Sequence, residues 1–277
     1  MQAYNKSELE NYFLAEEAKK LYQKKFLSKE QLQNINAQLV QLKSNPNIFF
    51  RIGFFLLGSF LISTIISAFG LILFPLISED FEFIFFFYAI VAYIGLEVLV
   101  NMKFFRHGLD DAFVLTSQIS FLIGVGILTE AILPVLITML VLGVFFAIRF
   151  INTISALLAF IGLVGIFFNL IVEHDVMPKF YLSFVGLILA ILVYFFVVHL
   201  SKNQNFYPFF KTLDTVRVAS LLLGYLSMNY LVVRELSESL LNLEITNKSD
   251  VPLAFVFYGL TFLIPLLYFF LGIQWKD

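Results

Sequence analysis

Eight apolar stretches, separated by short polar segments, follow one another from Ile48 to Ile273. A hydrocarbon core about 30 Å thick requires about 20 apolar residues in a helix. Backbone N–H and C=O groups inside lipid must be paired within such a segment. We therefore predict helical spans at 49–74, 81–101, 112–128, 131–148, 154–172, 180–200, 218–233 and 253–273. The predicted fold class is all-α, a polytopic transmembrane helical bundle of about eight spans.

The composition supports a membrane protein and excludes several kinds of site. The 277 residues are 60% hydrophobic and only 14% charged, whereas charged residues make up about a quarter of a soluble domain. The formal net charge of -2 gives no basic field for nucleic acid. The absence of cysteine excludes disulfides, thiolate catalysis and cysteine-bound metal. No zinc-protease, nucleophile-elbow or phosphate-loop motif is present, so we expect neither an enzyme nor a cofactor.

The third and fourth predicted spans have two possible forms. Only Thr129 and Glu130 separate them, and both are short. They form either a tight hairpin of two spans or one broken element, and a re-entrant pair would reduce the total to six spans. The seventh span, at 218–233, is also close to the minimum length for crossing the membrane.

The cations between the spans alternate from one side to the other. With the N-terminus inside, the inner segments hold Lys103, Arg106, Arg149, Lys202, Lys211, Arg217 and Lys276, and the outer segments hold Lys179, Arg234 and Lys248. The first outer loop has no cation and carries Glu79 and Asp80. By the positive-inside rule we expect an even number of spans in a cell (inner) membrane, with both termini in the cytoplasm.

Residues 1–47 are polar and are predicted to form a helical hairpin ahead of a transmembrane domain at 48–277. Ser7 with Glu10, and Ser28 with Gln31, have the spacing of capping boxes, which predicts helices over about 8–25 and 29–43. The apolar side of the first is Leu9, Tyr12, Phe13, Leu21 and Tyr22. So short a segment cannot bury a large core alone. We expect it to dock on the membrane domain, on a protein partner, or on a copy of itself.

Two loops share a short pattern. Phe104 to Asp110 and Phe209 to Asp214 both contain two Phe, a cation and then Leu-Asp, and each precedes the third helix of a possible four-helix half. A parallel 4+4 repeat would place them in this way. The alternative, which we favour, is chance similarity in a Phe-rich chain, with Asp as a common helix cap.

Polar side chains within the second, third and fourth spans are the candidate functional residues. Tyr93, Glu97 and Asn101 repeat every four residues and share a helix face, and Gln118 lies at similar depth. Arg149 lies at the inner end of the fourth span, where it is either a topology signal in contact with lipid phosphate or part of a ligand site. A carboxyl group in a membrane helix is costly and indicates a functional site by default. These groups either line a polar cavity open to the cytoplasm, or Glu97 is protonated or paired with Lys103 or Arg149 and only holds helices together.

Five further residues have two interpretations each. His107, Asp110 and Asp111 suggest a metal site, but further ligands are missing and both carboxylates are placed to cap the third span. We therefore predict no metal. Asn169 and Asn229 are expected to bond to neighbouring helices rather than to a ligand.

The arrangement of a short helical N-terminal region before many hydrophobic spans resembles the uncharacterised "predicted membrane protein" families of bacteria, particularly Bacteroidetes. The matching residues are the segment Tyr22 to Leu32 and the onset of the first span, Arg51-Ile52-Gly53-Phe54. The resemblance implies a bacterial membrane location and supplies no catalytic residues.

Three functional classes follow from these observations. The first is a regulatory, scaffold or envelope-associated protein that acts through helix contacts and the hairpin, with the lipid bilayer and a protein or second copy as partners. The second is a small-solute transporter or channel with Glu97 as its proton or cation site. The third is a membrane enzyme acting on lipid-linked substrates through Arg149. We expect the first.

Overall fold

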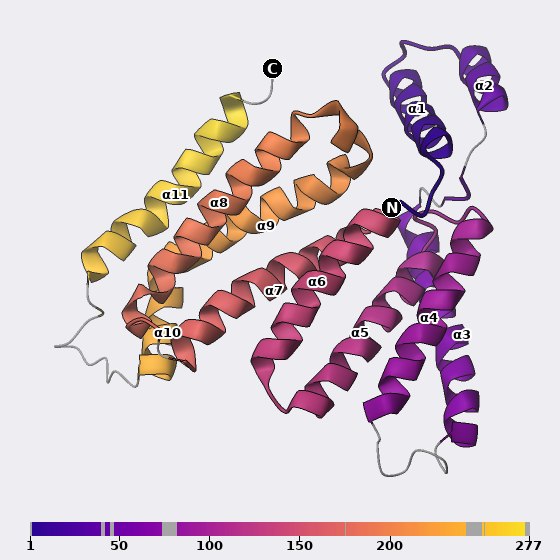
Figure 1. The fold of residues 1–277 in the computed structure, drawn as a ribbon. Helices are drawn as coiled ribbons and strands as arrows, with labels where there is room; N and C mark the ends of the chain where they lie inside the picture. Colours follow the sequence, from indigo (N-terminus) through magenta and orange to yellow (C-terminus); the bar gives the residue numbers. More distant parts are fainter. Residues whose placement is uncertain are drawn as a thin grey trace. The chain divides into compact units, whose positions relative to one another are not determined.

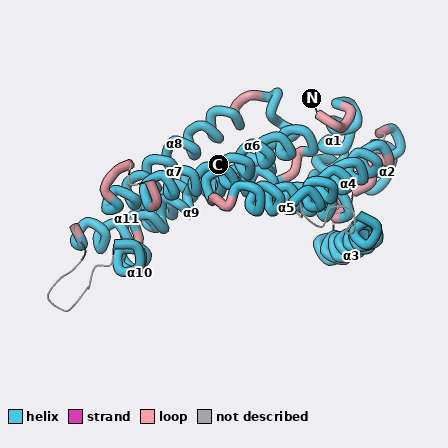
Figure 2. The backbone as a smooth tube through the Cα atoms, turned by 60° about the horizontal axis from the view of Figure 1, so that its bottom comes forward, coloured by secondary structure: helices cyan, strands magenta, loops and turns pink. Residues whose placement is uncertain are grey.

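The computed structural model describes residues 2–39, 42–44, 47–73, 82–174, 176–241, 251 and 253–274. Its α-helices are α1 (Lys6–Gln23), α2 (Lys29–Gln38), α3 (Ile48–Leu73), α4 (Glu82–Asn101), α5 (Leu109–Thr129), α6 (Ile132–Phe150), α7 (Thr153–Val172), α8 (Leu182–Ser201), α9 (Phe210–Met228), α10 (Tyr230–Leu241) and α11 (Ala254–Gln274), with 3-10 turns at Lys179–Tyr181 and Gln204–Phe209. The all-α prediction is confirmed, and Figure 2 shows helix joined by short loops throughout the described chain. The loop carrying Glu79 and Asp80 and the cations Lys248 and Lys276 lie outside the described residues.

Six described helices, α3 to α8, are long and apolar enough to cross a membrane, which supports a multi-pass membrane protein. The segment over Gln204–Ser237 passes the same test only as a pair of helices bent by 65°, and the apolar part of α11 covers Ala254–Phe270. The prediction of eight spans therefore stays open at these last two elements.

The third and fourth predicted spans are two separate helices. α5 has 21 residues and α6 has 19, so each is long enough to cross the bilayer. Glu130 ends α5 in the left-handed conformation, with φ 49°, and its N–H bonds to the carbonyl of Gly126. The structure therefore shows two helices joined by a tight turn and not one broken element.

The seventh predicted span, at 218–233, has the wrong boundaries. The helix begins at Phe210 and ends at Met228, and Asn229 is extended, with φ -73° and ψ 123°. The Asn229 side-chain oxygen accepts hydrogen bonds from the N–H groups of Leu231 and Val232, so it caps the next helix, α10. The apolar sequence continues across this break, which is why composition alone did not reveal it.

The chain divides into two compact units, residues 1–159 and 160–277. In the first unit, α5 is the central helix and packs against α3, α4 and α6, and Figure 1 shows the neighbouring helices of this group alongside it. Gly58 of α3 lies against Ala112 of α5, and Gly143 of α6 lies against the backbone of Ser155 and Ala159 in α7. Close approach at small residues is the usual way in which membrane helices pack.

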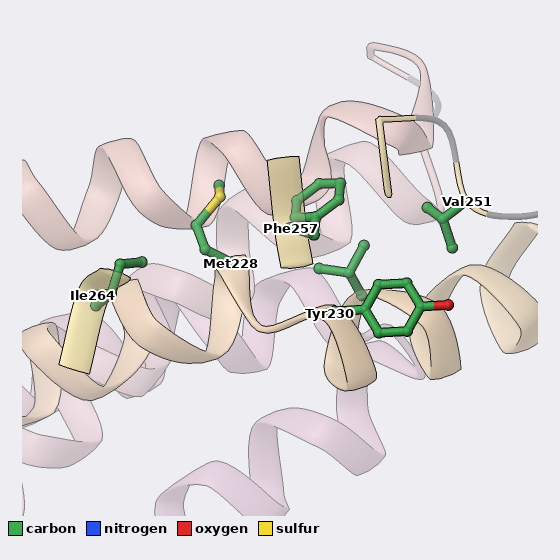
Figure 3. Close-up of a cluster of buried hydrophobic side chains, with 6 residues drawn as sticks. Met228, Tyr230, Val251, Phe257 and Ile264 are labelled. Atoms are coloured by element: carbon green, nitrogen blue, oxygen red, sulfur yellow. The ribbon is translucent and has the colours of Figure 1, made fainter. Parts of the chain in front are cut away.

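In the second unit, α8 packs along α9, and α11 contacts both α9 and α10. A cluster of buried side chains fills the space where these helices meet, and Figure 3 shows Phe257 of α11 pointing between Met228 and Tyr230. Tyr230 also stacks on Tyr258, with ring centroids 3.9 Å apart. The break at Asn229 thus occurs within a packed core.

The N-terminal residues form the predicted hairpin of α1 and α2. Ser28 and Gln31 make both hydrogen bonds of a capping box, as predicted. Ser7 is not the cap of α1, because Asn5 occupies that position and accepts a hydrogen bond from the Ser7 N–H. The predicted apolar side is also partly wrong, because Leu21 and Tyr22 are exposed.

The hairpin is attached to the rest of the first unit at both of its ends. At its start, the Ala3 N–H bonds to the carbonyl of Arg149 at 2.9 Å. At its end, Lys43 forms a one-residue β-bridge with Phe104, through an N–H donated to Lys103 and a carbonyl that accepts from Phe105.

Replacing Gly143 by Ala should destabilise the protein by about 2 kcal/mol, because an added Cβ overpacks the α6–α7 contact. That Cβ would lie 2.7 Å from the backbone nitrogen of Ala159 and 2.7 Å from the carbonyl oxygen of Ser155, and backbone cannot rotate away. Gly53→Ala is the matched control, since a Cβ at Gly53 meets nothing within 4 Å. Thermal unfolding in detergent compares the two, and equal effects would contradict the close α6–α7 packing.

Candidate functional site

Three of the predicted site residues meet at the end of the first unit that carries the hairpin. Glu97 of α4 accepts hydrogen bonds from Arg149 of α6, at 2.8 Å from Nε and 2.6 Å from Nη2. Tyr93, one turn before Glu97, packs its ring against Phe146 and Phe150 of α6, with centroids 6.0 Å away in both cases. The geometry corresponds to the second interpretation of Glu97, an ion pair that joins two helices.

The other two predicted residues lie elsewhere. Asn101 is exposed at the last position of α4. Gln118 is buried, with 2% of its surface exposed, and its side-chain NH₂ donates to the Ser155 hydroxyl at 2.5 Å. The five predicted site residues therefore do not form one cluster.

A second polar network extends from Gln118 across the first unit, and sequence reasoning did not assemble it. Ser155 donates from both its N–H and its hydroxyl to the side-chain oxygen of Asn152. The Asn152 NH₂ donates to Asp111 at 2.9 Å, and Arg51 of α3 donates to the other oxygen of Asp111 at 2.8 and 2.6 Å. This network, Arg51–Asp111–Asn152–Ser155–Gln118, connects α3, α5 and the start of α7.

Asp110 organises the loop before α5. Its carboxylate accepts hydrogen bonds from three successive backbone N–H groups, those of Arg106, His107 and Gly108, at 2.7, 2.9 and 2.9 Å. Gly108 has a φ of 106°, and a side chain there would meet the carbonyl of Arg51. Both carboxylates are therefore committed to protein partners, and the described residues contain no group of three or more ligands suited to a metal ion.

The hairpin docks on this same loop through aromatic and polar contacts. The Phe105 ring is buried between Tyr4 and Tyr12, with centroids 5.0 and 5.1 Å away in edge-on geometry. The Tyr4 hydroxyl donates to the Phe104 carbonyl at 3.0 Å, and burial raises the pKa of Tyr4 well above its usual value. Glu8 pairs with Lys103 at 2.7 Å.

Arg106 lies beneath α1 and is held by aromatic rings. Its guanidinium carbon is 5.8 Å from the ring centroid of Phe13 and 5.1 Å from that of Phe105. Both terminal nitrogens are buried and make no hydrogen bond within the described part of the chain. Burial lowers the pKa of this guanidinium. Because the Arg106 guanidinium lies against the rings of Phe13 and Phe105, removal of either ring should weaken the docking of the hairpin.

Acidification should weaken the loop around His107. The imidazole packs against the rings of Phe54 and Phe104, and burial, followed by the charge of Lys43, lowers the pKa of His107 below its ordinary value of 6.5. Because the pKa of His107 is lower in the folded protein, protonation favours the unfolded chain. The contribution of neutral His107 to stability is therefore present above pH 6.5 and is lost as the pH falls below 6.5. Unfolding temperatures at about pH 7.5 and about pH 5.5 should therefore differ less for His107→Gln than for the natural protein. An unchanged difference would contradict this role.

Asn229 bonds to the helices on either side of it, α9 and α10, as predicted, whereas Asn169 makes no such bond among the described residues. The Asn229 NH₂ donates to the hydroxyl of Tyr225 one turn earlier, and its oxygen caps α10. The Asn169 side-chain oxygen is buried and has no hydrogen-bond partner among the residues that the structure describes.

The two loops of the possible repeat use their Asp differently. Asp110 binds the backbone of its loop, whereas Asp214 lies inside α9 and pairs with Arg217 at 2.5 Å. No family model, curated protein or solved structure matches this chain.

Proposed function

We propose that this chain is a regulatory or scaffold protein of the bacterial cell membrane, and that it acts through its N-terminal hairpin and its helix contacts rather than through a reaction or a transport cycle. The observation that carries this proposal is the docking of α1 on the loop between α4 and α5. Tyr4, Tyr12 and Phe13 surround Phe105 and Arg106 there. Because the polar hairpin is fixed to the ends of membrane helices, a partner that binds the hairpin can act on the helix bundle.

The pairing of intramembrane polar groups supports the same proposal. Glu97 is bonded to Arg149, and Asp111 is bonded to Arg51 and Asn152. Ionisable groups inside a membrane protein are paired with one another or mark a pathway for a substrate or ion, and we propose that the pairs here hold helices together. We accordingly propose that the protein is not an enzyme and needs no cofactor.

The proposed topology has eight spans with both termini in the cytoplasm. Helices α3 to α8 provide six, the bent pair α9–α10 provides the seventh, and α11 provides the eighth. This count and the alternation of cations between the spans favour the same orientation. The hairpin then lies in the cytoplasm, where soluble partners have access to it.

One observation favours a small-solute transporter as the second candidate. The side chains of Glu97 and Arg149 retain 28% and 30% of their surface exposed, so this ion pair is not sealed within the first unit. If water reaches it from the cytoplasm, Glu97 becomes a proton or cation site.

Cysteine labelling separates the two functions, because the chain has no cysteine of its own. Single cysteines replace Glu97, Gln118, Asn169 and Asn229, and a membrane-impermeant maleimide is added from each side. Val176→Cys, in the connection after α7 with 64% of its surface exposed, is the reactive control. We expect the control to react and the four membrane positions to stay unlabelled. Labelling of the membrane positions would establish an aqueous path and replace our proposal by transport.

A further inference from the structure

One face of α1 is exposed and has the spacing of a helix-pairing surface. Glu10, Leu14, Glu17, Leu21 and Lys24 follow at intervals of four and three residues, which places them in one stripe along the helix. All five are exposed, including 53% of Leu14 and 44% of Leu21. Tyr12, which meets Phe105, lies on another side of the helix. The docked hairpin therefore leaves this stripe uncovered.

The charges along α1 change sign at its middle. After Lys6, which pairs with Glu10 one turn later, the part up to residue 17 carries Glu8, Glu10, Glu16 and Glu17, and the remainder and following turn carry Lys19, Lys20, Lys24 and Lys25. A parallel pair of such helices would bring like charges together. An antiparallel pair brings the acidic half of each helix against the basic half of the other, which is favourable.

Taking the proposed function as its basis, we infer that the partner of this stripe is a second copy of the chain, with the two α1 helices antiparallel. In the register that this requires, Leu14 packs on the partner's Leu21, and Leu21 packs on the partner's Leu14. Glu10 then lies opposite the partner's Lys24 and the partner's Lys25. Glu17 lies near the two-fold axis beside the partner's Glu17, and the partner's Lys20 is within reach to offset that repulsion. The stripe is thus complementary to itself, as an interface with two-fold symmetry must be.

The attachment of α1 is compatible with this symmetry. Ala3, Glu8 and Phe13 contact Arg149, Lys103 and Arg106 in turn, so α1 runs along the end of the first unit. Two copies side by side in a membrane are related by a two-fold axis along the membrane normal. Rotation about this axis reverses the direction of a helix that lies in the membrane plane, so the two α1 helices are antiparallel. Confinement to the membrane also raises the effective concentration, so one short helix pair is sufficient for association.

Disulfide cross-linking in the full-length protein tests the register. Leu14→Cys and Leu21→Cys variants carrying different tags are reconstituted together in liposomes and oxidised. Because a disulfide needs Cα atoms within about 7 Å, we expect the mixed Leu14–Leu21 product to exceed the Leu14–Leu14 product roughly five-fold. Both positions are exposed, so the substitutions leave the hairpin core unchanged.

Charge reversal then tests the pairing. Glu10→Lys should lower the mixed cross-link several-fold, and Lys24→Glu with Lys25→Glu on the other copy should restore it. Glu130→Lys, an equal change of charge at the exposed turn after α5, is the control and should have no effect.

Three results would overturn the inference. They are mixed and identical cross-links in equal yield, a dominant Leu14–Leu14 product as in a parallel pair, or cross-linking of these positions in native membranes to a different polypeptide. Binding of the reconstituted protein to separate phosphatidylglycerol vesicles, lost in Lys24→Glu with Lys25→Glu, would assign the stripe to lipid and overturn it also. All of these leave the proposed function in place, whereas labelling of the membrane cysteines would remove the proposed function and leave the cross-links unaffected.

Discussion

Replacing Asp111 by Ala should lower the free energy of unfolding by about 3 kcal/mol, because it leaves two donors without their acceptor. Arg51 and Asn152 both donate to this carboxylate, and only 5% of Asp111 is exposed. The Arg51 side chain is one-third exposed, so water offsets part of its loss, and the expected value is at the lower end for a buried pair. Thermal unfolding in detergent measures the change. Asp111→Asn, which keeps an acceptor oxygen, should fall between Asp111→Ala and the natural protein.

Asp214→Ala is the matched control for this prediction. Asp214 also pairs with an arginine, Arg217, but both side chains are more than 30% exposed and belong to one helix. Such a pair contributes less than about 1 kcal/mol. Equal losses at Asp111 and Asp214 would show that the network around Asp111 does not hold α3, α5 and α7 together.

Replacing Phe105 by Ala should release the hairpin. The ring is 1% exposed and contacts Tyr4, Tyr12 and the guanidinium of Arg106, so its removal opens a cavity at the docking contact and leaves Arg106 poorly surrounded. Removing a buried Phe side chain costs about 3 kcal/mol or more. If docking protects α1, its amide hydrogens should exchange roughly 100-fold faster, since each 1.4 kcal/mol corresponds to about a factor of ten.

Phe60→Ala provides the comparison for Phe105. Phe60 lies in α3, and 71% of its surface is exposed, so the same truncation there should leave exchange in α1 unchanged. Unaltered exchange of α1 in Phe105→Ala would mean that the hairpin is held by its polar contacts alone. Far-ultraviolet circular dichroism establishes that both variants keep their membrane helices.

The membrane helices were predictable because long apolar runs leave few alternatives in a bilayer. The capping box at Ser28 was also predictable, since its signal lies within four residues. Two local errors have a common cause. Asn5 and Asn229 each cap a helix with a short polar side chain, at positions where the search followed serine in one case and apolar composition in the other.

The site was harder to predict because its contacts are distant in sequence. Arg51 and Asp111 are 60 residues apart, and no periodicity relates them. Their opposite charges at the facing ends of two predicted spans were the available signal. Glu97 had two cations within reach, Lys103 and Arg149, and only the structure assigns Lys103 to Glu8 and Arg149 to Glu97. Helical depth ranks candidate residues, but it does not indicate which helices are neighbours.

The two attachment points of the hairpin have a mechanical consequence. Because Ala3 is bonded at the end of α6 and Lys43 is bonded beside the end of α4, the hairpin of α1 and α2 is anchored to the same unit on both sides. A force that pulls on the hairpin is shared between the Ala3–Arg149 hydrogen bond and the Lys43–Phe104 bridge, so neither attachment carries it alone. Tension applied at the turn between α1 and α2 therefore acts on α4 and α6 together and changes the distance between their ends.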